Sequence, residues 1–121
     1  MEMVHNGVEY GVMQLLAETY DLMKRGLGMG DDEVGEVYTL WNKGVLNSYL
    51  IEITSRIFAR EDEDSHTRLI DKLLDVARQK CTGMWTSQSA LPLLLPLSTI
   101  DLPVAMRDLS VFDLVRKQAR G

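Results

Sequence analysis

Apolar residues along this chain recur at the three- and four-residue spacing of amphipathic helices, and no segment shows the alternation expected of a strand. The longest such run extends from Val4 to Leu27 and places its apolar residues mostly on one broad face. These residues are Val4, Val8, Met13, Leu15, Leu16, Tyr20, Met23 and Leu27. The spacing therefore predicts a long first helix, and the pattern of the whole chain predicts an all-α fold.

Two glycines, Gly7 and Gly11, fall inside the predicted first helix, although each costs about 1 kcal/mol of helix stability relative to alanine. A glycine inside a helix often marks a place where another part of the protein packs closely against the backbone. We therefore expect close packing at both positions. Lys24 and Arg25 in the last turn suit the negative end of the helix dipole.

The remaining patterns predict helices over residues 31–41, 46–60, 69–78, 82–94 and 101–119. Asp31 and Asp101 are expected to act as N-caps, with Pro103 inside the first turn of the last helix. The predicted helices form a single helical domain over residues 1–121, large enough for one modest core.

Composition limits the classes of partner. Hydrophobic residues make up 45% and charged residues 26% of the 121-residue chain, which argues against disorder. The formal net charge of −5 disfavours nucleic acid and anionic membrane as partners, but it does not exclude a small anionic ligand. The single cysteine, Cys81, rules out an internal disulfide. With no secretory leader, and with its most apolar stretch broken by Pro92 and Pro96, the chain is expected to be cytoplasmic.

Two features bear on metals and cofactors. The acidic run at residues 61–64 fits a cation site, but four consecutive acids without an ordered loop signature are more typical of a solvated turn. His66 is expected to be exposed beside it. We therefore expect no metal site, and because no Gly-x-Gly-x-x-Gly follows a strand we expect no dinucleotide site in this chain.

Polar side chains are dense at the start of the first predicted helix. His5, Asn6, Glu9 and Tyr10 supply an imidazole, an amide, a carboxyl and a phenol within two turns. Side chains three and four residues apart share a helix face, so Asn6 lies beside Glu9 and Tyr10, and His5 leans toward Glu9. This convergence predicts a functional site, although a lone glutamate in the first turns is more often a dipole partner or a surface charge.

A second candidate site precedes the helix predicted at residue 82. Lys80 and Thr82 stand next to Gly83 at a helix N-terminus, where free N–H groups and the helix dipole favour an anion. Taken alone, an N-cap threonine beside a solvated lysine is the commoner explanation. Arg107, also taken alone, fits a solvated helix arginine.

Several of these runs resemble one enzyme family. Residues 3–11 read Met-Val-His-Asn-Gly-Val-Glu-Tyr-Gly, and residues 80–86 read Lys-Cys-Thr-Gly-Met-Trp-Thr. Trp-Asn-Lys at 41–43 and Leu-Ile-Glu-Ile-Thr at 50–54 follow in the same order. These runs resemble the start of the all-helical C-terminal domain of 6-phosphogluconate dehydrogenase, and the similarity becomes faint after Arg107.

The resemblance implies roles for the first motif. Glu9 would be the general acid that protonates the enediol after decarboxylation, a role suited to a buried carboxyl with a raised pKa. Asn6 and His5 would orient the substrate hydroxyls and the nicotinamide end. Glu2 stands where the family has its catalytic lysine, and we attribute it to the place at which the chain was cut.

The resemblance also implies an anion pocket. Tyr10, Lys80, Thr82 and Arg107 would bind the substrate phosphate from three helices, with Arg107 as a bidentate clamp. Cys81 stands where the family has a glycine, and Met84 stands where it has a lysine. Trp85 is expected in the core.

The implied parent is an NADP-dependent oxidoreductase that converts 6-phosphogluconate to ribulose 5-phosphate with loss of carbon dioxide. Its dinucleotide-binding domain is not among these 121 residues. We therefore expect the chain alone to be inactive and to bind no cofactor. The alternative is a non-catalytic helical module that binds a phosphosugar or dimerises, and exposed apolar surface predicts a homo-oligomer.

Overall fold

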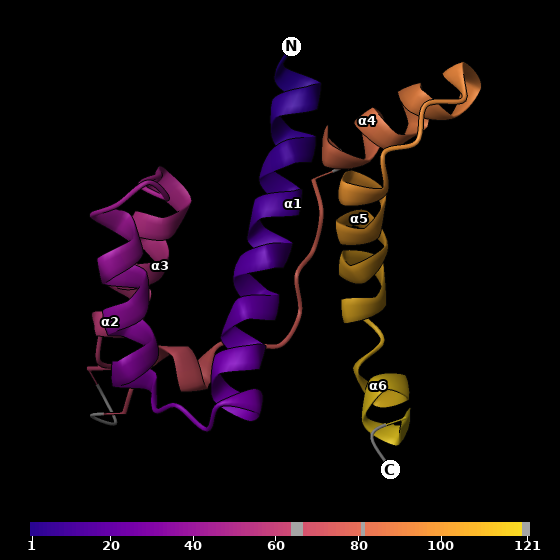
Figure 1. Cartoon of the computed structure of the whole chain (residues 1–121). Helices are drawn as coiled ribbons and strands as arrows, with labels where there is room; N and C mark the ends of the chain where they lie inside the picture. Colours follow the sequence, from indigo (N-terminus) through magenta and orange to yellow (C-terminus); the bar gives the residue numbers. More distant parts are fainter. Residues whose placement is uncertain (64–66, 81, 120–121) are drawn as a thin grey trace. The chain divides into compact units, whose positions relative to one another are not determined.

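A computed structural model describes residues 1–63, 67–80 and 82–119. The elements are α1 (Glu2–Asp21), the π-helical turn η1 (Leu22–Gly26), α2 (Asp31–Asn42), α3 (Tyr49–Ala59), the 3-10 turn η2 (Leu69–Lys72), α4 (Thr82–Ala90), the 3-10 turn η3 (Leu91–Leu93), α5 (Ser98–Ser110) and α6 (Asp113–Ala119) (Figure 1). Helices dominate and the described residues contain no strand, so the predicted all-α fold is confirmed.

The first three predicted helices form with small shifts of their ends. Asp31 is the first residue of α2 and not its N-cap, because Gly30 adopts an extended conformation and Glu33 accepts a hydrogen bond from the Gly30 N–H at 2.7 Å. The third helix starts at Tyr49 and not at residue 46, since the Ser48 hydroxyl caps it by accepting from the backbone N–H of Ile51.

The prediction of a helix over residues 69–78 is wrong. Only η2 forms, and from Leu73 to Lys80 the chain follows no helix. Leu73, Leu74 and Val76 of this segment are exposed. The backbone of this segment is satisfied by side chains distant in sequence, which local periodicity does not reveal.

The prediction of one helix over residues 101–119 is also wrong. Two helices form, α5 and α6, and they are separated by Val111 and Phe112. Because α5 begins at Ser98, Asp101 lies inside it and Leu97 occupies the N-cap position. Pro103 is likewise inside α5 and not in its first turn.

Two compact units make up the chain. Unit 1 comprises residues 1–14 and 74–121, and unit 2 comprises residues 15–73. Unit 2 has a core of Met23, Val34, Tyr38 and Phe58. The Tyr38 ring stacks on Phe58, and its hydroxyl donates to the Leu16 carbonyl at 2.8 Å. Buried in this way, the phenol has its one polar group satisfied.

Unit 1 is organised around the two glycines of α1. A Cβ on Gly7 would lie 2.9 Å from the Thr86 hydroxyl of α4, and one on Gly11 would lie 3.1 Å from the Thr99 carbonyl of α5. The Thr86 hydroxyl also donates to the Met3 carbonyl at 2.7 Å. The prediction of close packing at both glycines is therefore confirmed.

The apolar face predicted for the first helix is only partly buried. Val4, Val8, Leu15 and Leu27 are exposed, whereas Met23 is buried. In the first half of α1 the buried positions are Gly7, Tyr10 and Gly11. Small residues are buried here because they let two helices approach, which apolar spacing alone does not predict.

Trp85 was expected in the core, but its side chain is 49% exposed. The buried residues of α4 are Gly83, Thr86 and Ala90, at helical spacing. Trp85 falls off that stripe, so it faces away from the packed side of α4. None of the helices in the described residues combines the length and the apolar character needed to cross a membrane.

Candidate functional site

Tyr10 is the centre of the candidate site, in unit 1. Its side chain is only 8% exposed on α1. Gly83 at the start of α4 packs on the ring so closely that a Cβ there would lie 2.7 Å from two ring carbons. The Tyr10 hydroxyl accepts a hydrogen bond from the backbone N–H of Lys80 at 3.2 Å. Its own proton thus remains available to a ligand.

Arg107 of α5 covers the other part of the Tyr10 ring. Its guanidinium carbon lies 4.0 Å from the ring centroid, a cation–π arrangement. One terminal nitrogen donates to the Arg78 carbonyl at 3.2 Å, and the other to the Met13 sulfur at 3.3 Å. The guanidinium is half-buried and held in place before any ligand arrives.

Thr82 is the first residue of α4 and is half-buried. The amides of the first helical turn have no intrahelical acceptor, and the dipole there favours negative charge. The Lys80 residue is exposed, just before α4, and Cys81 lies outside the described residues. The arrangement offers a cation, a phenol proton and a helix N-terminus, which are the groups that bind a phosphate.

The structure thus brings together Tyr10, Arg107 and the backbone of Lys80, with Thr82 two residues further along. Three of the predicted phosphate residues lie on helices α1, α4 and α5, whereas Lys80 lies outside any helix.

The other group of predicted residues lies on the exposed side of α1. His5 Nε2 is 3.4 Å from Glu9 Oε1, which confirms that the two side chains face each other. Asn6 is half-buried. The Glu9 side chain is 38% exposed, so the burial expected for this carboxyl is not present in this chain.

Sequence reasoning missed three residues that shape the site. Met13 and Arg78 hold the Arg107 guanidinium, and no local pattern indicates a pairing across 94 or 29 residues. Gly83 was interpreted as part of an anion-binding turn, whereas its lack of a side chain also makes room for the Tyr10 ring. The glycine in the sequence indicated close packing at this position, but nothing in the sequence indicated that the Tyr10 ring is what packs there.

The acidic run shows surface pairing. Asp62 pairs with Lys72 at 2.5 Å, and Glu61 lies 3.7 Å from Arg68. Asp64 and His66 lie outside the described residues. Within residues 1–63, 67–80 and 82–119, no three histidine, cysteine or acidic residues are grouped so as to hold a metal ion.

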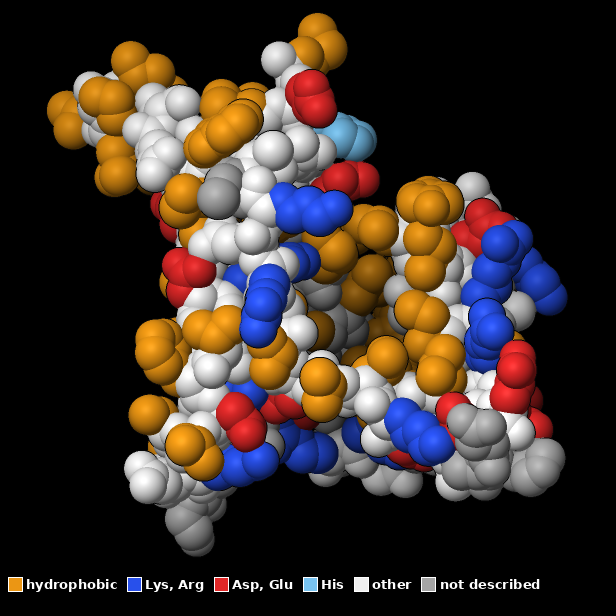
Figure 2. All heavy atoms as spheres, turned by 180° about the vertical axis from the view of Figure 1, so that it is seen from behind, with side chains coloured by type: hydrophobic (Ala, Val, Ile, Leu, Met, Phe, Trp, Pro, Cys, Tyr) orange, Lys and Arg blue, Asp and Glu red, His pale blue; other side chains and the backbone are white. Residues whose placement is uncertain are grey.

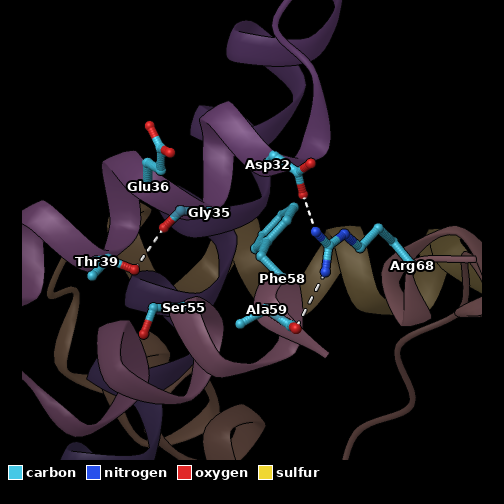
Figure 3. A pocket seen from close by; sticks show the side chains of 8 residues that line it. All are labelled: Asp32, Gly35, Glu36, Thr39, Ser55, Phe58, Ala59 and Arg68. Carbon is cyan, nitrogen blue, oxygen red and sulfur yellow. Dashed lines mark hydrogen bonds and ion pairs between the residues drawn. The ribbon is translucent and has the colours of Figure 1, made fainter. Parts of the chain in front are cut away.

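A hollow of about 340 Å³ lies in unit 2, and none of its lining residues is a predicted site residue (Figure 3). It is lined by Asp32, Gly35, Glu36, Thr39, Ser55, Phe58, Ala59 and Arg68. Asp32 is paired with Arg68, and the hydroxyls of Thr39 and Ser55 donate to carbonyls of their own helices. Because most of these polar groups are already engaged within the protein, the hollow offers little to a ligand.

The model of the family described as 6-phosphogluconate dehydrogenase, C-terminal domain, matches residues 1–121. The chain belongs to this family. The matched range extends past Arg107, where the sequence resemblance was expected to become faint, to residue 121.

Relatives of the 6-phosphogluconate dehydrogenase family are similar over most or all of the chain. The NADP(+)-dependent, decarboxylating 6-phosphogluconate dehydrogenase of Bacillus subtilis is 51% identical over 121 residues, which are 100% of this chain and 26% of that protein. The decarboxylating enzyme of Schizosaccharomyces pombe is 52% identical over 110 residues, 91% of this chain and 22% of that protein. The chain therefore spans about a quarter of the length of these curated relatives.

A solved structure gives the same result. Plasmodium falciparum 6-phosphogluconate dehydrogenase, described in its apo form and in complexes with NADP+ and with 6-phosphogluconate, superposes with a TM-score of 0.93 at 44% identity. The superposition covers 98% of this chain and 25% of that one. At this identity the similarity extends beyond the fold to the family itself.

Proposed function

We propose that this chain supplies the phosphate-binding part of a decarboxylating, NADP-dependent 6-phosphogluconate dehydrogenase. The observation that carries the proposal is the Arg107 guanidinium 4.0 Å from the Tyr10 ring, with the Tyr10 hydroxyl bonded to the Lys80 N–H. The names of the relatives and the substrate complex of the Plasmodium enzyme support it.

The proposed chemistry assigns one task to each group. Arg107 pairs with the phosphate through charge-assisted hydrogen bonds, and the Tyr10 hydroxyl donates to a phosphate oxygen. Lys80 adds a flexible point charge, and the Thr82 hydroxyl with the first-turn amides of α4 adds neutral donors. Because Arg107 is already held by Met13 and Arg78, little side-chain entropy is lost on binding.

The first motif is proposed to serve the reacting end of the substrate. Glu9 is the general acid that protonates the enediol, while Asn6 and His5 orient hydroxyls and the nicotinamide end. His5, 3.4 Å from Glu9, is placed to steer that carboxyl. In the proposed parent reaction, NADP accepts the hydride and 6-phosphogluconate yields ribulose 5-phosphate and carbon dioxide.

The proposal for the 121 residues by themselves is narrower. They form a single cytoplasmic helical domain, carry Glu2 where the family has its catalytic lysine, and bind no NADP. They therefore have no dehydrogenase activity alone. Reduction of NADP by the purified chain with 6-phosphogluconate would contradict this part of the proposal.

Calorimetric titration of the chain with 6-phosphogluconate tests the site. The Arg107→Ala variant is expected to weaken binding about ten- to hundredfold, since a charge-assisted pair is lost. Arg56→Ala is the matched control, because Arg56 is an exposed arginine of unit 2 that pairs only with Glu52 of its own helix in the described contacts. Absence of binding by the unaltered chain, or equal binding by the Arg107 variant, would contradict the proposal.

A second candidate function is self-association as a helical module, and one surface favours it. Leu91, Leu93, Leu94 and Leu95 are 71%, 67%, 90% and 55% exposed. Figure 2 shows hydrophobic side chains gathered there, at the upper left, where α4 continues into η3. Clustered exposed leucines favour association with another apolar surface, and a second copy of the chain provides one.

A further inference from the structure

Residues 74–80, called the strap below, lead directly into the candidate anion site. The strap contains no helix, and its apolar side chains do not anchor it, because Leu74 is 86% and Val76 38% exposed. Yet its last residue, Lys80, donates its backbone N–H to the buried Tyr10 hydroxyl. Something other than apolar burial must therefore fix its course.

Ser110, the last residue of α5, is hydrogen-bonded to the middle of the strap. Its hydroxyl oxygen accepts the Ala77 N–H at 2.9 Å. The same oxygen lies 3.1 Å from the Ala77 carbonyl and 2.7 Å from the Arg107 carbonyl, so its one proton is donated to one of these. The Ser110 hydroxyl thus bonds the Ala77 N–H and also lies within hydrogen-bonding distance of the Ala77 carbonyl.

Arg116 of α6 holds the start of the strap. Its guanidinium donates to the Asp75 carboxylate and to the Asp75 carbonyl, both at 2.6 Å. The nitrogen that reaches the Asp75 carbonyl also donates to the Ser110 carbonyl at 2.9 Å. The Arg116 side chain is only 23% exposed, whereas the Asp75 side chain is 70% exposed, so the arginine is the buried partner of this bond set.

The end of the strap is held by Arg107 of the candidate site and by its neighbour Asp108. Arg107 donates to the Arg78 carbonyl at 3.2 Å, and Asp108 accepts from the Gln79 side chain. Bonds at Asp75, Ala77, Arg78 and Gln79 therefore precede Lys80. The reach of the chain is at most about 3.6 Å per residue, so fixing Ala77 limits where Lys80 can lie.

We propose that Ser110 is a positioning residue for the anion site, acting with Arg116 through the strap. In this proposal Ser110 does not bind the anion itself. It fixes the backbone that leads to Lys80 and Thr82, and so the position of these residues next to Tyr10 and Arg107. The binding part of this inference rests on the proposed function, whereas the positioning part concerns the free chain alone.

Amide hydrogen exchange measured by NMR on the free chain tests the positioning part. In Ser110→Ala the Ala77 amide should exchange about tenfold faster, and so should the Lys80 amide, although Lys80 does not touch Ser110. Ser110→Thr keeps a hydroxyl and should restore both. Ser98→Ala, the other serine of α5, is the matched control, and amides within α5 such as Val104 report whether the unit stays folded.

Titration with 6-phosphogluconate tests the binding part. Ser110→Ala should weaken binding severalfold at unchanged melting temperature, and Ser110→Thr should recover it. If the unaltered chain does not bind, the proposed function fails, while the exchange measurement still decides the positioning role. If the Ala77 amide of Ser110→Ala exchanges faster while the Lys80 amide exchanges at the unaltered rate, the inference is overturned. If Ser110→Ala does not fold, Arg116→Gln provides the same test from the start of the strap, with the same two amides measured.

Discussion

At the scale of single residues, burial decides which polar groups are available for function. Tyr10 and Tyr38 are both buried phenols, but their hydroxyls are used differently. The Tyr38 hydroxyl donates to the Leu16 carbonyl, whereas the Tyr10 hydroxyl accepts from the Lys80 N–H and keeps its proton for a ligand. One tyrosine is therefore structural, and the other is suited to bind an anion.

Tyr38 gives stability a dependence on alkaline pH. Burial raises the pKa of its phenol above the ordinary value of 10.0, an effect that the hydrogen bond with Thr19 partly opposes. Below pH 10 the phenol is protonated in both the folded and the unfolded chain. Above pH 10 the unfolded chain loses this proton first, so the free energy of unfolding falls as pH rises through the raised pKa.

The Tyr38→Phe variant should show a weaker decrease in urea-unfolding free energy between pH 9 and pH 11. At neutral pH it should be less stable by about 1 kcal/mol, because the hydrogen bond from the Tyr38 hydroxyl to the Leu16 carbonyl is lost. Tyr49→Phe, at a side chain 72% exposed, is the control for removing a phenol. If the free energy of unfolding depends on pH identically in Tyr38→Phe and in the unaltered chain, Tyr38 is not the source of the alkaline dependence.

At the scale of elements, glycine positions decide how closely helices approach. Gly11 brings α1 against the Thr99 carbonyl of α5, and Gly83 brings the start of α4 onto the Tyr10 ring. The same unit holds Tyr10 beside Arg107, 4.0 Å from the guanidinium carbon to the ring centroid. The helical spacing of apolar residues predicted α1, α2 and α3, but it did not predict which face of α1 is buried.

Gly11→Ala should destabilise the chain by about 1–3 kcal/mol through overpacking, despite a gain in helix propensity of about 1 kcal/mol. The new Cβ would lie 3.1 Å from a backbone carbonyl oxygen, which cannot move without shifting α5. Gly44→Ala is the control, because its Cβ would have 3.7 Å to the nearest atom. Urea unfolding measures the difference, and a Gly11→Ala chain as stable as the unaltered one would show that α1 and α5 can separate freely.

At the scale of the whole molecule, many large apolar side chains remain on the surface, including the leucines at positions 91, 93, 94 and 95. Light scattering should therefore find a dimer or larger species in the micromolar range. The pair Leu91→Glu and Leu93→Glu should shift it toward monomer. Leu40→Glu, at an exposed leucine of α2, should not. A monomer for the unaltered chain across that range would contradict self-association.

The sequence by itself determined the helical class of the fold. Helices α1, α2 and α3 depend on hydrogen bonds within four residues, so local spacing and caps predict them closely. The residues predicted for the phosphate pocket were named through the family resemblance, and the structure brings Tyr10 and Arg107 into contact. Their roles stay proposals.

The tertiary structure alone decided the course of residues 73–80 and the break between α5 and α6. A helix would have satisfied the strap backbone locally, but Ser110 and Arg116 satisfy it from 33 and 41 residues away. No local pattern contains such partners. For the same reason the sequence placed Tyr10, Lys80 and Arg107 in one pocket only through resemblance, whereas their geometry comes from packing around Gly11 and Gly83.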